Sequence, residues 1–205
     1  MRLMLCTSLL AVALSLVGCS SNRRGDGVPT PRPQNTPLAD AENEKAYELI
    51  KSGRYKEAEQ AVQRALDADV LFGPARNNLG LIYYHDGKLY EAAWEFQQAI
   101  KAMPYKPEPR NNLGLVFEKA GKYGEAAEEF SKARRIEPDN PEYLSNLARA
   151  WMRLGKRDAE MKALLEEVVL KDPRREWSSW ARLNLLRLRS DDPNAPVGPA
   201  TAPAR

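Results

Sequence analysis

The chain has few of the side chains on which most metal and catalytic sites depend. Among its 205 residues, cysteine occurs only as Cys6 and Cys19, and His85 is the single histidine. Beyond residue 19 the chain therefore lacks the cysteines of a disulfide, a zinc cluster or a cysteine nucleophile, and it has a single histidine for a catalytic triad. We expect no metal, no cofactor and no catalytic residue.

The region after the first 37 residues also lacks a net charge. The formal charge of +3 comes entirely from residues 1–37, and residues 38–205 carry 27 basic and 27 acidic side chains. The sequence pI of 8.8 therefore gives no reason to expect a nucleic-acid partner. The charge is nevertheless unevenly distributed within this region. Residues 39–146 are net acidic, with 15 basic and 19 acidic side chains, and residues 147–190 are net basic, with 11 basic and 6 acidic side chains.

The one long apolar run lies at the start of the chain. Leu3 to Val17 follows Arg2 and is shorter than the roughly 20 residues of a membrane-spanning helix, so it is typical of a signal-peptide core. It ends in Leu16-Val17-Gly18-Cys19, which resembles the lipobox of bacterial lipoproteins. The resemblance implies removal of residues 1–18 and lipidation of Cys19. The alternative is an ordinary secretory signal that contains a cysteine.

This resemblance also implies a location. The residue after Cys19 is Ser20 rather than the Asp that marks inner-membrane retention in enteric bacteria. We therefore expect a protein anchored by lipid in the bacterial envelope and facing the periplasm, with the outer membrane favoured. Residues 19–38 and 191–205 each contain four prolines and few apolar side chains, so we predict a linker and a disordered tail.

Between these segments the sequence repeats with a period of 34 residues. Gly53, Gly87, Gly121 and Gly155 are spaced by 34, and each precedes a basic residue. The pattern Leu-Gly-x-x-Tyr at residues 79–83 recurs in varied form at 113–117 and 147–151. The frame resembles the tetratricopeptide repeat, a helix-turn-helix unit.

The resemblance implies an all-α solenoid over residues 39–190. We predict units at 39–72, 73–106, 107–140 and 141–174, followed by a capping helix over 174–189. The glycine in each turn is expected to have a positive φ. Gly80 and Gly114 are expected where two helices cross closely, with Phe96 and Phe130 filling the adjacent space.

In such a solenoid the first helices of the units form a concave wall, which we call the first-helix wall. A wall of aromatic, apolar, amide and charged side chains suits a peptide or a partner helix. The predicted partner-binding residues are Asn43, Tyr47, Asn77, Leu81, Tyr84, His85, Asn111, Glu118, Arg149 and Arg153. Burial between units is an equal alternative for Leu81, and His85 is expected to be a solvated wall residue rather than a catalytic base.

Two further features have competing interpretations. Asn78, Asn112 and Asn146 recur at the sixth position of their units, where hydrogen bonding between units is favoured over binding of a ligand. The basic C-terminal end beside Trp177 and Trp180 either docks an acidic partner or keeps a short capping helix soluble.

These features together predict a non-catalytic interaction scaffold or assembly factor. The layout is similar to that of small tetratricopeptide-repeat lipoproteins that assist pilus or secretin assembly, and of adaptors for cell-wall enzymes. The expected partner is an envelope protein or peptide, with the membrane contacted only through the lipid anchor. A periplasmic ligand-binding protein or an accessory subunit of an enzyme is the alternative, and the oligomeric state is left open.

Overall fold

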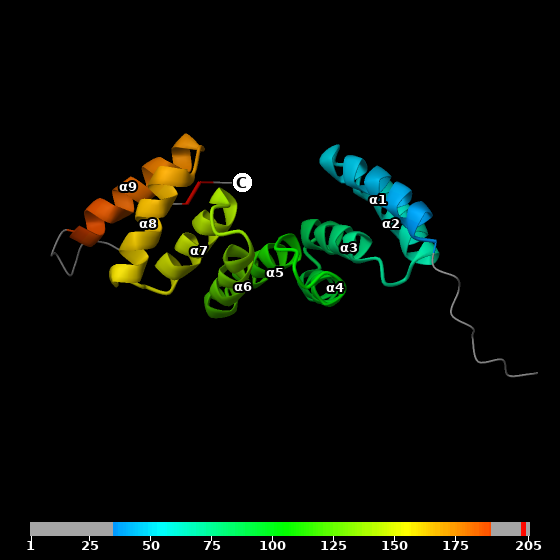
Figure 1. Cartoon of the computed structure of the whole chain (residues 1–205), viewed down its shortest axis with the longest axis horizontal. Coiled ribbons are helices and arrows are strands. Elements are labelled where there is room, and N and C mark those ends of the chain that lie inside the picture. Colours follow the sequence, from blue (N-terminus) through cyan, green and yellow to red (C-terminus); the bar gives the residue numbers. More distant parts are fainter. Residues whose placement is uncertain (1–34, 190–201, 204–205) are drawn as a thin grey trace, which may run out of the picture. The chain divides into compact units, whose positions relative to one another are not determined.

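A computed structural model describes residues 35–189 and 202–203 of the chain. Within these residues the secondary structure is entirely helical (Figure 1). This confirms the predicted all-α solenoid, whereas the predicted signal peptide, Cys19 and most of the linker and tail lie outside the described residues. The helices are α1 (Thr36–Lys51), α2 (Tyr55–Ala68), α3 (Gly73–His85), α4 (Leu89–Ala102), α5 (Glu108–Lys119), α6 (Tyr123–Ile136), α7 (Pro141–Arg153), α8 (Ala159–Lys171) and α9 (Arg175–Arg189).

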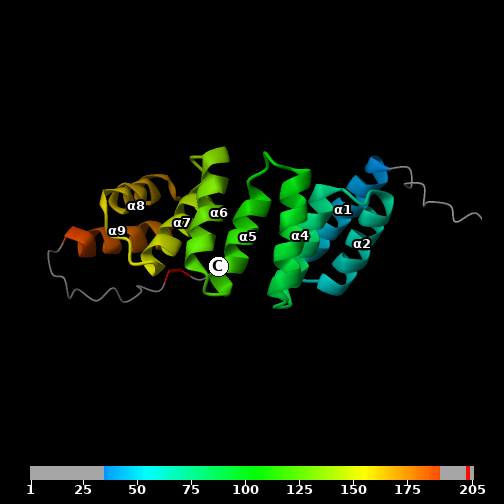
Figure 2. The same cartoon turned by 90° about the horizontal axis from the view of Figure 1, so that it is seen from below.

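The helices pack against their neighbours in the chain. The most extensive contacts pair α1 with α2, α3 with α4, and α5 with α6 (Figures 1 and 2). The first helices also meet across units, since α1 contacts α3 and α3 contacts α5. Among the described residues, no helix combines the length and apolarity needed to cross a bilayer.

Each turn within a unit is closed by the predicted glycine. Gly53, Gly87, Gly121 and Gly155 have φ between 72° and 77°. In the first unit the N–H of Arg54 donates to the carbonyl of Leu49 at 2.9 Å, across the end of α1. Only glycine adopts this conformation without a steric penalty, so the 34-residue period of glycine follows from the geometry of the turn.

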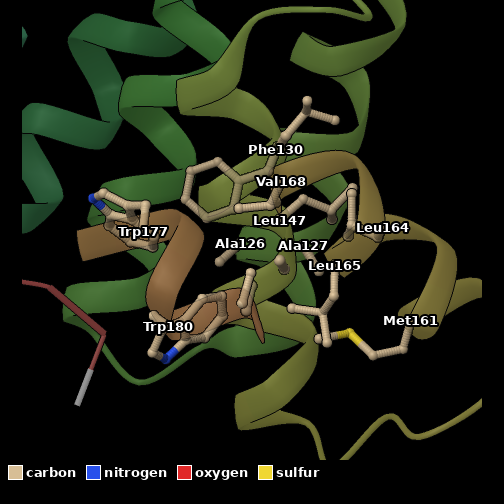
Figure 3. Packing of buried hydrophobic residues seen from close by; sticks show 14 of the residues in the cluster. Ala126, Ala127, Phe130, Leu147, Met161, Leu164, Leu165, Val168, Trp177 and Trp180 are labelled. Atoms are coloured by element: carbon tan, nitrogen blue, oxygen red, sulfur yellow. The ribbon is translucent and has the colours of Figure 1, made fainter. Parts of the chain in front are cut away.

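The C-terminal core is closed by α9 (Figure 3). Trp177 is 3% exposed, and together with Trp180 it packs on side chains of α6, α7 and α8, such as Phe130, Leu147 and Leu165. Because both indoles are buried, this end of the protein is capped rather than left with two tryptophans for a partner. The burial of Trp177 and Trp180 therefore favours the capping role of α9.

The buried carboxylate of Asp172 links Ser145 of α7 to Arg174, the residue before α9. The side chain of Asp172 is fully buried, accepts a hydrogen bond from Ser145 Oγ at 2.5 Å, and binds the guanidinium of Arg174. Burial alone raises the pKa of Asp172, but the bonds from Arg174 and Ser145 outweigh it and hold this pKa below its usual value. The carboxylate therefore stabilises the fold when it is ionised.

This lowered pKa predicts an acid-sensitive contribution to stability. The contribution is complete above about pH 4 and is lost as the pH falls through the lower pKa of the folded state. Urea unfolding at pH 6 should show that Asp172→Asn is less stable than wild type by about 1–2 kcal/mol, with the difference shrinking towards pH 2. Asp139→Asn, at an exposed ion pair with Lys171, is the control. A pH-independent difference at Asp172 would contradict this interpretation.

Candidate functional site

Side-chain hydrogen bonds connect the first helices of successive units. In each case the Nδ2 of a sixth-position asparagine donates to the Oδ1 of the fifth-position asparagine in the preceding unit. The pairs are Asn78 to Asn43 at 2.8 Å, Asn112 to Asn77 at 2.9 Å, and Asn146 to Asn111 at 2.8 Å. This amide ladder confirms that the sixth-position asparagines bond between units.

The two ends of the amide ladder differ. Towards the C-terminus the amide groups have further hydrogen-bond partners. Asn111 Nδ2 donates to Glu142 Oε1 at 3.2 Å, and Asn146 Oδ1 accepts from Arg149 at 3.2 Å. Asn43 and Asn77 use only their oxygens in the ladder, and within residues 35–189 their Nδ2 groups have no acceptor. Both side chains are half-buried, so two amide donors remain available at the N-terminal end of the first-helix wall.

Asn43 and Asn77 both line a pocket of about 330 Å³, which we call the wall pocket. Asn43 and Tyr47 come from α1 and Asn77 from α3, so three predicted wall residues meet there. Tyr47 is 45% exposed and supplies an accessible aromatic surface. The remaining lining is Glu44, Pro74, Asn78, Met103, Lys106, Glu108 and Pro109. Apolar walls with a few convergent polar groups are the usual composition of a ligand site.

Two predicted wall residues bind each other instead of facing solvent. The guanidinium of Arg149 forms a two-pronged ion pair with the carboxylate of Glu118, and their side chains are only 11% and 17% exposed. The same guanidinium lies 5.3 Å from the centre of the Trp177 ring. The structure therefore places Arg149 and Glu118 in a contact between units, next to the buried core.

Three further predicted wall residues are buried or half-buried. Asn111 is buried in the amide ladder, and Leu81 is half-buried against the cluster that contains Phe96. Tyr84 is half-buried, and Lys119 Nζ lies 4.5 Å from the centre of its ring. These residues shape the wall between units more than they present an open surface.

The last residues of α3 and α7 reach the turns of the preceding units. The His85 ring stacks on Tyr55 with ring centres 3.6 Å apart, and Arg153 lies 5.9 Å from the centre of the Tyr123 ring. With residues 53–57 and Asp86, His85 lines a separate pocket of about 420 Å³. The structure thus places His85 beside a turn and does not bring it to the wall pocket.

Sequence reasoning missed part of the wall pocket. Met103 and Lys106 belong to the connection between α4 and α5, and Pro109 lies in the first turn of α5. None of them occupies a wall position of the repeat frame, so periodicity gives no signal for them. The proline at the unit boundary was a detectable sign of the turn, but not of the pocket that it borders.

Comparisons with known proteins place this geometry in a family. Two sequence profiles, both described as tetratricopeptide repeat, match residues 43–107 and 118–183. A search of curated proteins finds no match. A structure of PilF from Pseudomonas aeruginosa aligns with a TM-score of 0.67 and 18% identity, over 73% of this chain and 68% of that chain.

Two other similar structures are of proteins described as binding peptides. YrrB, described as a tetratricopeptide-repeat protein with an unusual peptide-binding site, aligns with a TM-score of 0.64 and 19% identity, over 78% of this chain and 82% of that one. The first such domain of Spaghetti (RPAP3), bound to an HSP90 peptide, gives 0.57 and 21%, over 62% and 100%. At these identities the likeness concerns the fold alone.

Proposed function

Since this chain is an all-α tetratricopeptide-repeat solenoid, we propose that it is a non-catalytic scaffold or assembly factor that binds a peptide segment of a partner protein. The observation that carries the proposal is the wall pocket, in which Asn43, Tyr47 and Asn77 converge. Proteins of the same fold bind peptides, which supports a protein partner for this one.

The wall pocket has the groups that an extended peptide requires. The Nδ2 atoms of Asn43 and Asn77 can donate to backbone carbonyls without breaking the amide ladder, because the ladder uses their oxygens. Tyr47 offers apolar area for a side chain of the peptide. Glu44 and Glu108 against Lys106 make the rim more acidic than basic, which favours a partner segment with a basic side chain.

We also propose that the scaffold works in the bacterial envelope. The support is the apolar run Leu3–Val17 and the lipobox-like residues 16–19, which would leave Cys19 as the lipidated first residue. Residues 19–38 would then separate the solenoid from the outer membrane, where it would hold an envelope protein such as a pilus, secretin or cell-wall component.

The wall pocket can be tested with a photo-reactive residue at position 47 in cells and, as a control, at position 90. Tyr90 is 82% exposed and therefore more accessible than Tyr47, but it lies on α4, a second helix, outside the first-helix wall. We expect cross-linking of a specific envelope protein from position 47 only. Its cross-linked segment, made as a peptide, should bind the Tyr47→Ala variant at least about tenfold more weakly, because buried aromatic anchors dominate interfaces.

Two outcomes would contradict the proposal. One is equal affinity of wild type and Tyr47→Ala for the peptide. The other is specific cross-linking from position 90 and none from position 47. Tyr90→Ala should bind the peptide as the wild type does.

A further inference from the structure

The outer face of α9 carries exposed leucines as well as arginines. Leu183 is 43% exposed and Leu186 is 64% exposed. Residues four, three and four positions apart form one stripe along a helix, and the stripe that faces away from the core consists of Arg175, Ser179, Arg182 and Leu186, all exposed. Within residues 35–189 neither arginine of this stripe forms an ion pair. One face of α9 therefore covers the core, and the other presents apolar and basic side chains.

The outer face of α1, the first described helix, has a complementary composition (Figure 1). The same four-three-four spacing gives a stripe of exposed residues, which are Pro37, Ala41, Glu44 and Glu48. Asp40, Lys45 and Lys51 lie beside it, and Glu48 forms an exposed ion pair with Lys51 at 3.0 Å. The stripe is therefore apolar at its N-terminal end and acidic at its C-terminal end.

The two stripes match when the helices are antiparallel. Arg175 then lies opposite Glu48. Arg182 lies opposite Ala41 and within one helical turn of Glu44, while Leu186 meets the apolar end of α1. Each arginine thus has a carboxylate within reach, and the leucine meets apolar side chains. Within one chain α1 and α9 do not pack on each other, since α1 packs on α2 and α3 and α9 packs on α8.

We propose that α9 of one copy packs antiparallel on α1 of a second copy, so that the protein associates head to tail. The charge of the chain supports this arrangement, because residues 39–146 are net acidic and residues 147–190 are net basic. The two contacting surfaces differ, so each associated copy keeps one free end and the contact produces a row of copies rather than a closed pair. Such a row would present several wall pockets side by side.

This contact goes beyond the proposed function and is separable from it. The stripe on α1 shares Glu44 with the wall pocket but includes neither Asn43, Tyr47 nor Asn77. Peptide binding and self-association can therefore hold or fail independently.

Two variants block opposite ends of the protein. Arg175→Glu with Arg182→Glu reverses the charge of the α9 stripe, and Ala41→Arg with Glu48→Arg does so on α1 without changing a residue of the wall pocket. The purified full chain is sedimented in density-matched detergent. Association of the wild type should grow with protein concentration and weaken at high salt, because salt screens exposed charges. Each variant alone should associate at least about tenfold more weakly, because like charges then face each other.

Mixing the two variants separates this contact from other modes of association. The α1 variant keeps an unchanged α9, and the α9 variant keeps an unchanged α1, so the mixture should form a 1:1 complex that grows no further. Circular dichroism checks that each variant is folded. The matched control, Lys101→Glu with Lys162→Glu, makes the same charge change at exposed positions of α4 and α8 and should associate as the wild type does. A wild type that stays monomeric, a mixture without the 1:1 complex, or a control that loses association equally would each overturn the proposal.

Discussion

Replacing Cys19 by Ser should release the protein from the membrane fraction or leave it as an unprocessed precursor. Two or three acyl chains contribute about 0.8 kcal/mol for each methylene buried in the bilayer, so the anchor predicted at Cys19 is effectively permanent. No described helix could replace it as a membrane span. We therefore expect cell fractionation and immunoblotting to find the wild-type protein in the membrane pellet. The variant should be found outside the pellet or at the higher mass of the unprocessed precursor.

The sequence contains a matched control for this experiment. Cys6→Ser removes the only other cysteine but leaves Leu16-Val17-Gly18-Cys19 intact, so we expect normal processing and wild-type fractionation. If Cys19→Ser remained in the membrane pellet at the mature mass, the lipoprotein interpretation would be wrong. We expect the solenoid and the wall pocket to be unaffected, because residues 35–189 contain all the helices and all the lining residues described above.

The fold was predictable because each unit packs mainly on its neighbours in the chain. The turn glycine, such as Gly87, recurs in all four units, and the pairing of Gly80 with Phe96 recurs at Gly114 and Phe130, so these local requirements appear in the sequence as a period. The first helix was predicted to begin within a unit starting at residue 39, yet α1 begins at Thr36. The difference comes from a helix cap that the repeat frame does not include. The Asn35 side chain accepts a hydrogen bond from the Leu38 N–H at 3.3 Å.

The candidate site was only partly predictable, for a different reason. The repeat frame assigns positions to a wall, and for Tyr47 and Asn77 this was enough to find residues that line one pocket. The frame does not say which wall residues bind each other. Arg149 and Glu118 are 31 residues apart in the sequence and pair across two units. Lys106, which lines the wall pocket, belongs to a connection between units. Such contacts depend on the rotation of one unit against the next.

The close contact inside a unit can be tested at Gly114 of α5. A Cβ built there lies 2.6 Å from Cε1 of the Phe130 ring, which is fully buried and cannot move aside freely. Gly124 is a matched control in the next helix, because a Cβ there meets nothing within 4 Å.

Gly114→Leu should therefore lower the free energy of unfolding by about 1–3 kcal/mol or more, whereas Gly124→Leu should be neutral or slightly stabilising. For a chain of this length, 1–3 kcal/mol corresponds to a loss of roughly 2–12 °C in the thermal midpoint, measured by circular dichroism. Adding Phe130→Leu removes the ring atoms that Gly114→Leu would strike, so the double variant should be more stable than the sum of the two single effects predicts. Additive effects, or an unchanged midpoint for Gly114→Leu, would show that the contact between α5 and α6 does not require glycine.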